Sequence, residues 1–179
     1  MNFAAVHNLP VIFVIQDNQL ALGTRIDQHG AGDLHDWPAM YGIEHWICDS
    51  NNVLDMFAAT RIAAERCRAG QGPAVIVADT FRMGGHATHY ERAARDTFAT
   101  ELFAAWGRRD PIGLFEAYLE GHGIETETLL TIEAEVTDEI ERAAEEALAS
   151  SDRMPAPEQA LYEGFAEKGV LIGLENRPI

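Results

Sequence analysis

Two uninterrupted runs of apolar residues predict that this chain contains a parallel β-sheet. The runs cover residues 11–15 and 74–78, and neither contains a polar position. A strand that is apolar at every position is typical of a parallel sheet covered on both faces. A shorter strand is predicted at residues 45–48, and a helical pattern separates it from the second run. Strand, helix and strand in this order predict a right-handed crossover, and hence an α/β fold.

The helix of this crossover is predicted to begin after Asn52 and to end at Gly70. Asn52, with Asp55 three residues later, resembles a capping box, and a glycine is the common residue at a helix C-terminus. The apolar face of the helix is expected to comprise Val53, Phe57, Ala64 and Cys67.

Further helices are indicated on both sides of this unit by apolar residues at helical spacing. They are predicted at residues 2–8, near 37–41, and at 101–107, 111–119 and 129–149. Two polar segments without an apolar period, residues 19–36 and 80–98, are predicted to be loops. The chain from residue 151 onward is expected to be an irregular tail that docks on the body or on a partner.

Charge and composition exclude several classes of function. The 179 residues carry 13 Lys and Arg against 29 Asp and Glu, a net charge of −16. Such a surface repels phosphates, so neither nucleic acid nor an anionic membrane is an expected partner. No apolar run approaches the roughly 20 residues needed to span a bilayer, and there is no secretory signal pattern. We therefore expect a cytoplasmic protein in which Cys48 and Cys67 are reduced and buried.

Candidate chemistry is expected where the parallel strands end, because open sheets bind ligands at the carboxyl ends of their strands. Asp17 and Asn18 follow the first run and offer the hard oxygen ligands that Mg²⁺ prefers. An ordinary Asx turn is the alternative interpretation of this pair.

A second candidate segment follows the other apolar run. Arg82 and His86 flank Gly84 and Gly85, so an anion-binding guanidinium and a titratable imidazole surround backbone that a ligand could approach closely. A structural histidine is the alternative. His86 and His89 also form an H-x-x-H pair, which without a third ligand is weak support for zinc. The residue patterns by themselves thus indicate a phosphate- or cofactor-binding α/β domain.

Four segments resemble one known family. Residues 9–24, 69–73, 80–86 and 109–112 are similar, in order and spacing, to the alpha subunit of thiamine-diphosphate-dependent 2-oxoacid dehydrogenases. These enzymes are the decarboxylating components of pyruvate and branched-chain 2-oxoacid dehydrogenase complexes. The resemblance covers roughly residues 1–150.

The resemblance implies a role for four residues. Asn18 would be a side-chain ligand of Mg²⁺ close to the diphosphate, and Leu20 would give its backbone carbonyl to the metal. His86 would contact the diphosphate and line the route to the reactive carbon, as the catalytic residue of the set. Arg82 would bind the cofactor's anion or order the loop that carries His86.

Three departures from the family pattern are visible. The family's Gly-Asp-Gly, whose Asp is a second metal ligand, lies further upstream than the seventeen residues before Asn18 allow. Asp17 replaces the usual first Asn, and Asp-Ser-Asn-Asn at residues 49–52 replaces Asp-Gly-Asn-Asp. Ala87 stands where mitochondrial relatives carry a phosphorylated serine, so kinase control there is not expected.

The implied architecture is a partial parallel-sheet thiamine-diphosphate-binding fold with a helical carboxyl-terminal region. Residues 1–100 would be the carboxyl-terminal part of the cofactor-binding domain, 101–150 a helical extension and 151–179 a docking tail. The implied activity is oxidative decarboxylation of a 2-oxoacid with acyl transfer to lipoamide, with thiamine diphosphate and Mg²⁺ as cofactors. The partners would be the beta subunit, in an α2β2 heterotetramer, and a lipoyl-bearing acyltransferase. We expect the isolated chain to be inactive, and the alternative function is a truncated, non-catalytic interaction module.

Overall fold

The fold is described by a computed structural model that covers residues 1–87 and 93–157. Its contacts divide the chain into two units, Met1–Ile124 and Glu125–Ile179. The first unit contains the sheet and most of the helices, and the second contains one long helix. The predicted α/β class with a helical carboxyl-terminal region is confirmed.

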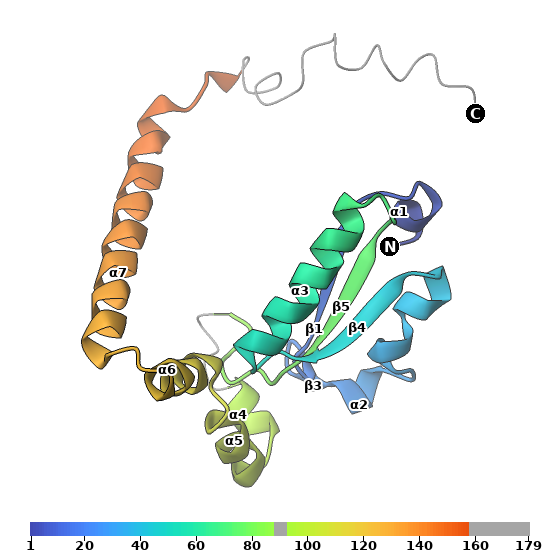
Figure 1. The fold of residues 1–179 in the computed structure, drawn as a ribbon, viewed down its shortest axis with the longest axis horizontal. Helices are drawn as coiled ribbons and strands as arrows, with labels where there is room; N and C mark the ends of the chain where they lie inside the picture. Colours follow the sequence, from blue (N-terminus) through green and yellow to red (C-terminus); the bar gives the residue numbers. More distant parts are fainter. Residues whose placement is uncertain (88–92, 158–179) are drawn as a thin grey trace. The chain divides into compact units, whose positions relative to one another are not determined.

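The sheet has three parallel strands in the order β1-β5-β4 (Figure 1). The strands are β1 (Ile12–Asp17), β4 (Glu44–Asp49) and β5 (Ala74–Asp79). The central strand β5 is the most apolar, and its residues 74–78 are all buried. Both uninterrupted apolar runs of the sequence are therefore strands, and they pair directly with each other.

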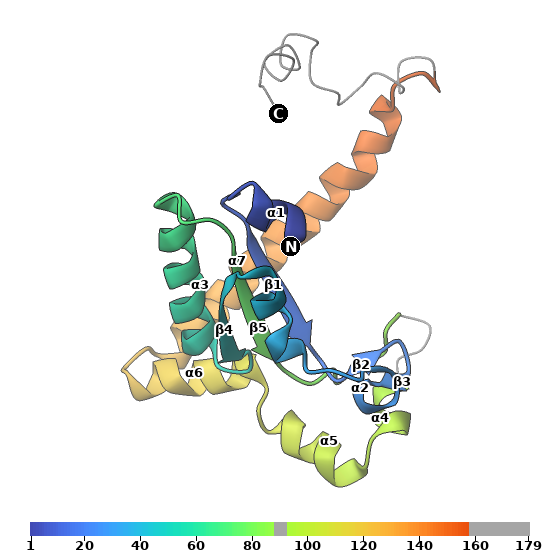
Figure 2. The same ribbon diagram turned by 90° about the vertical axis from the view of Figure 1, so that its right-hand side faces the viewer.

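One face of the sheet is covered by α3 (Val53–Arg68), which connects β4 to β5 (Figure 2). The helix buries Ala59, Ala63 and Cys67 against the sheet. The expected apolar face was right for Cys67 and wrong at the start of the helix, because Phe57 is 65% exposed and Val53 36% exposed. Small side chains line the contact because they let the helix backbone lie close to β5. In an alanine-rich helix, two neighbouring faces have similar apolar spacing, so periodicity could not separate them.

The start of α3 is capped by one side chain rather than two. The Asn52 side-chain oxygen accepts hydrogen bonds from the backbone N–H groups of Leu54 and Asp55, at 3.1 and 3.4 Å. The Asp55 carboxylate accepts from the Asp49 N–H at 2.8 Å and not from Asn52. Asn52 is thus the predicted N-cap, but the reciprocal capping box was wrong.

The other face of the sheet packs on the chain's first residues. Val75 and Val77 point to this side, where they form a buried cluster with Ile43. Partly buried side chains from α1 (Asn2–Val6) and β1 pack against this cluster. These are Met1, Ala5, Phe13 and Ile15.

Both predicted loops contain short regular elements. Residues 19–36 include a hairpin of β2 (Leu20–Ala21) and β3 (Thr24–Arg25) and then α2 (Ile26–His29). Within residues 80–98 lies α4 (Ala93–Thr97). Strands of two residues and helices of one turn are too short for a hydrophobic period to develop, so the sequence pattern does not reveal them. Two 3₁₀ turns, η1 (Leu34–Asp36) and η2 (Pro38–Tyr41), precede β4, and η2 agrees with the helical turn predicted there.

The remaining helices follow the sheet. The first unit continues with α5 (Thr100–Gly107) and α6 (Pro111–Gly121). The second unit contains α7 (Thr126–Ala149), followed by the 3₁₀ turn η4 (Ser150–Arg153). Residues 158–179, most of the predicted tail, lie outside the described residues, and the boundaries proposed at residues 100 and 150 stay predictions. Among the helices of the described chain, none has the length and hydropathy needed to cross a membrane.

An aromatic cluster holds α5 beside the end of β5. Phe81, which is 6% exposed, stacks on Trp106 with ring centroids 5.5 Å apart. It also contacts Phe98 at 4.7 Å. Buried aromatic pairs of this kind contribute about 0.5–1.5 kcal/mol beyond the area they bury. The segment that leaves β5 is therefore anchored at Phe81, next to Thr80 and Arg82.

Candidate functional site

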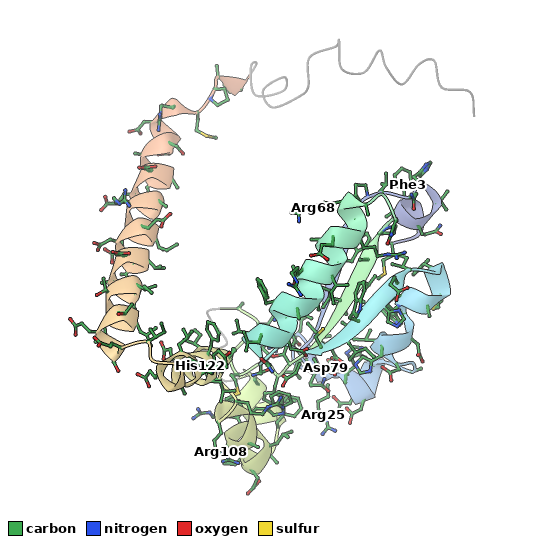
Figure 3. All side chains as sticks on the ribbon, viewed as in Figure 1. Phe3, Arg25, Arg68, Asp79, Arg108 and His122 are labelled. Carbon is green, nitrogen blue, oxygen red and sulfur yellow. The ribbon has the colours of Figure 1, made fainter. Side chains whose placement is uncertain are left out.

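Each strand of the sheet ends in an aspartate. Asp17 of β1 and Asp49 of β4 both lie in register with Asp79 of central β5. Figure 3 labels Asp79 at this end of the sheet. Like charges directly opposite one another on neighbouring strands are unfavourable, so this row needs compensating positive charge.

Two side chains supply that charge, Arg109 from after the sheet in the sequence and His35 from between β1 and β4. The Arg109 guanidinium lies 2.6 Å from an Asp49 carboxylate oxygen and stacks over the Trp106 ring at 4.5 Å. His35, in η1, approaches Asp79 with 2.8 Å between its Nε2 and the Asp79 Oδ1. These residues also line a cavity of about 580 Å³ at the carboxyl end of the sheet.

The environment of His35 favours its protonated form. The hydrogen bond with Asp79 is the largest influence and raises the pKa of the imidazole, against a smaller opposing effect of burial. The other ring nitrogen, Nδ1, lies 3.3 Å from an Asp33 carboxylate oxygen. One ligand atom each of Asp17, His35 and Asp79 lie within 4.8 Å of one another, a spacing compatible with a metal ion. The hydrogen bond between His35 and Asp79 accounts for the proximity of two of these three residues without a metal.

Asn18 follows β1 in a turn closed by its own side chain. Its Oδ1 accepts a hydrogen bond from the backbone N–H of Leu20 at 3.1 Å. This is the Asx turn considered as the alternative to metal binding. An amide oxygen has two lone pairs, so the turn leaves one of them free for a cation. Leu20 is buried at the start of the β2–β3 hairpin.

Arg82 is tied to the same turn by its backbone. The Arg82 N–H donates to the Asn18 carbonyl at 3.2 Å, and the Arg82 guanidinium donates to the Leu22 carbonyl. The Arg82 Nε is buried and has no hydrogen-bond partner among residues 1–87 and 93–157. A buried donor without a partner is unusual and costs about 1–3 kcal/mol, so this N–H is suited to donate a hydrogen bond to an anion.

His86 is not joined to these residues. It is exposed, and no hydrogen bond or ion pair within residues 1–87 and 93–157 connects it to Asn18, Leu20 or Arg82. A Cβ placed on Gly84 would meet no atom within 4 Å, so the fold itself gives no steric reason for a glycine there. His89, the other member of the H-x-x-H pair, lies outside the described residues.

Three residues of this region were missed by sequence reasoning. His35 reaches the strand ends from a segment predicted as a loop, and Arg109 from the family-like segment 109–112, to which no site role was given. Asn51 is buried, at 7% exposed, and its side chain bonds both Thr80 and Arg109. One feature of the sequence could have indicated them: an aspartate ends each of the three strands. Three neighbouring carboxylates predict that positively charged side chains from other segments lie beside them.

The sequence also matches a family that has been described before. A sequence model of the family described as "Dehydrogenase E1 component" matches residues 1–158. The chain belongs to this family. The resemblance to alpha subunits of 2-oxoacid dehydrogenases is thereby confirmed.

Three relatives illustrate the similarity. The chain is 32% identical over 159 residues to "Pyruvate dehydrogenase E1 component subunit alpha" of Bacillus cereus, covering 87% of this chain and 41% of that protein. It is 31% identical over 169 residues to "2-oxoisovalerate dehydrogenase subunit alpha" of Bacillus subtilis, covering 93% and 50%. It is 34% identical over 130 residues to "3-methyl-2-oxobutanoate dehydrogenase subunit alpha" of Mycobacterium tuberculosis, covering 72% and 35%. The chain thus spans half or less of the length of these relatives.

Proposed function

We propose that this chain forms the metal- and diphosphate-binding part of the alpha subunit of a 2-oxoacid dehydrogenase. The proposal rests on one observation in a member of this family. Backbone hydrogen bonding places Arg82 beside the Asn18 turn, and within the part of the chain that the structure describes the buried Arg82 Nε has no hydrogen-bond partner. An anion and a cation bound next to each other, as in a metal–diphosphate complex, would suit these two residues.

The donor set fits Mg²⁺ better than a softer metal. Asn18 offers an amide oxygen and Leu20 a backbone carbonyl, and Mg²⁺ prefers such hard oxygen ligands together with phosphate oxygens and water. The guanidinium of Arg82 would bind a phosphate oxygen through the unpaired Nε. Thiamine diphosphate, when bound, would supply the carbanion chemistry that decarboxylates a 2-oxoacid.

The remaining residues would bind, orient and exclude water. Arg82 and the proposed Asn18–Leu20 metal site would fix the diphosphate end. His86, on the exposed segment that follows, would approach the reacting end and hold a proton there. Acyl transfer to a lipoyl-bearing acyltransferase, and assembly with a beta subunit as an α2β2 heterotetramer, belong to the same proposal. The relatives' names include both pyruvate and 2-oxoisovalerate dehydrogenases, so the names do not favour one 2-oxoacid substrate over the other.

The test compares two asparagine variants in the full-length subunit assembled with its beta partner. Asn18→Ala is expected to weaken Mg²⁺-dependent binding of thiamine diphosphate at least tenfold, the scale typical of a metal-site residue. Asn52→Ala is the matched control, because it also removes an asparagine that accepts backbone N–H groups, but at the start of α3. Calorimetric titration gives both affinities.

Two results would count against the proposal. Equal affinities of Asn18→Ala and the unmodified protein would contradict the assignment of the metal site. An unmodified assembly that binds no Mg²⁺–thiamine diphosphate would instead favour the non-catalytic interaction module.

A further inference from the structure

Asn51 is a buried polar residue whose side chain is not used by the helix it precedes. It lies between β4 and α3, but the neighbouring Asn52 caps α3. The Asn51 Nδ2 donates to the Arg109 carbonyl at 2.6 Å, and its Oδ1 accepts from the Thr80 hydroxyl at 2.9 Å. Both hydrogen-bonding ends of the amide are thus directed at other segments.

Thr80 begins the segment that carries Arg82 away from the sheet. On the β1 side, this segment is held by two backbone bonds, from Thr80 N–H to the Asp17 carbonyl at 2.9 Å and from Arg82 N–H to the Asn18 carbonyl at 3.2 Å. On the β4 side, the Ser50 N–H donates to the Asp79 carbonyl at 2.9 Å. Beyond Asp79, where the pairing with β4 ends, the Asn51 side chain provides the hydrogen bond to this segment on the β4 side.

The position of the Arg82 guanidinium depends on this support. Packing of Phe81 anchors this segment and backbone bonds hold its β1 edge, but neither restrains the edge that faces β4. Without a restraint there, the segment could tilt about Phe81, and the flexible arginine side chain would follow. Asn51 restrains the opposite edge, and its own position is fixed by the bond to Arg109, whose guanidinium is paired with Asp49. Asn51 itself is buried, and a buried amide whose two ends are both hydrogen-bonded gives this kind of rigidity.

We propose that Asn51 is a positioning residue, which acts through Thr80 to hold Arg82 where it can bind the diphosphate. This inference rests on the proposed function, because it assigns the anion to Arg82. It adds that the anion site depends on the connection between α5 and α6, because the Arg109 carbonyl in this connection fixes the Asn51 side chain. Neither Asn51 nor Arg109 touches the ligand in this arrangement.

The variants separate a lost hydrogen bond from lost packing. Thr80→Val keeps the shape of the side chain and removes the hydroxyl, whereas Thr80→Ser keeps the hydroxyl and serves as the rescue. Asn51→Ala removes both bonds of the amide. If Asn51→Ala fails to fold, the Thr80 pair carries the test alone.

Two measurements are made on the full-length subunit assembled with its beta partner. Hydrogen exchange of the Arg82 amide should become about tenfold faster in Thr80→Val, as expected for the loss of roughly one hydrogen bond, and unchanged in Thr80→Ser. Exchange in residues 74–77 of β5 should stay the same in both variants. The affinity for Mg²⁺ with inorganic diphosphate should fall about tenfold in Thr80→Val and remain normal in Thr80→Ser, by analogy with outer-shell partners of metal sites.

The outcomes distinguish this inference from the proposed function. Unchanged exchange at Arg82 in Thr80→Val overturns the positioning role. Faster exchange with unchanged affinity for diphosphate also overturns it, because the network would then be merely structural. Failure of the unmodified assembly to bind diphosphate overturns the proposed function, and with it the assignment of the ligand to Arg82.

Discussion

Replacement of Ile76 by alanine tests whether β5 is the centre of the core. Ile76 is fully buried in the middle strand and packs in the cluster that includes Ala59 and Ala63 of α3. The change removes three carbons, or about 2.4 kcal/mol at roughly 0.8 kcal/mol for each buried methylene. The cavity that remains adds to this loss, which brings the expected cost to about 3–4 kcal/mol.

The matched control is Val14→Ala on the neighbouring strand β1. Val14 is 58% exposed, so most of its side chain gains little from folding. Its replacement should cost about 0.5–1 kcal/mol, mostly through the weaker strand preference of alanine. The two variants therefore differ in burial while both alter an apolar strand residue.

Urea unfolding followed by tryptophan fluorescence measures both changes. Trp46 is a suitable probe because it packs against the same core cluster. With a slope of about 2 kcal/mol per molar urea, the midpoint should fall by about 1.5–2 M for Ile76→Ala and by less than about 0.5 M for Val14→Ala. Equal midpoint shifts for the two variants would refute the placement of β5 at the centre of the core.

Two further predictions concern stability. Because the pKa of His35 is raised in the folded protein, its ion pair with Asp79 should stabilise the fold fully below about pH 6.5 and lose its effect as the pH rises through the raised value. The urea midpoint of His35→Gln should thus lie below that of the unmodified protein by more at about pH 5.5 than at about pH 9. The loss of stability should stay below about 1 kcal/mol because the ion pair is partly exposed. A larger loss at the higher pH would contradict this reasoning. Gly72 has a φ of +87°, and a Cβ there would lie 2.4 Å from the Asn8 side-chain oxygen. Gly72→Ala should cost about 1–2 kcal/mol from backbone strain and further energy from displacing Asn8, which donates to the Gly70 carbonyl at 3.0 Å. Gly70→Ala, with a φ of +70° and open space around it, should show the strain alone, so a larger loss in Gly70→Ala than in Gly72→Ala, measured by thermal unfolding, would count against this reasoning.

Local pattern was sufficient for the elements that form the frame of the molecule. The strands β1 and β5 could be predicted because a continuous β-branched run has few alternatives to a strand buried on both faces. The helix between β4 and β5 predicted that these two strands run parallel. The direct pairing of β1 with β5 came only from the structure. The N-cap at Asn52 and the end of α3 near Gly70 are likewise set by residues within one turn of the helix end.

Local sequence pattern predicted only part of the candidate site. Asn18 and Arg82 could be selected because each lies within three residues of a strand end, and strand ends are where ligands bind in parallel sheets. Their roles toward a metal and a diphosphate came from the resemblance to a family. The Asx turn at Asn18 is also local, since it joins residues two positions apart.

The tertiary structure decided which distant residues meet. His35 pairs with Asp79 across 44 positions, Asn51 with the Arg109 carbonyl across 58, and Arg109 with Asp49 across 60. It also decided which face of α3 is buried, because the contact selects the small side chains that let the helix lie close to β5. Such pairings depend on the register of three strands and on the path of the chain between them. A single sequence constrains neither directly, since hydrophobic periodicity reports burial along one element and not the neighbour against which that element packs.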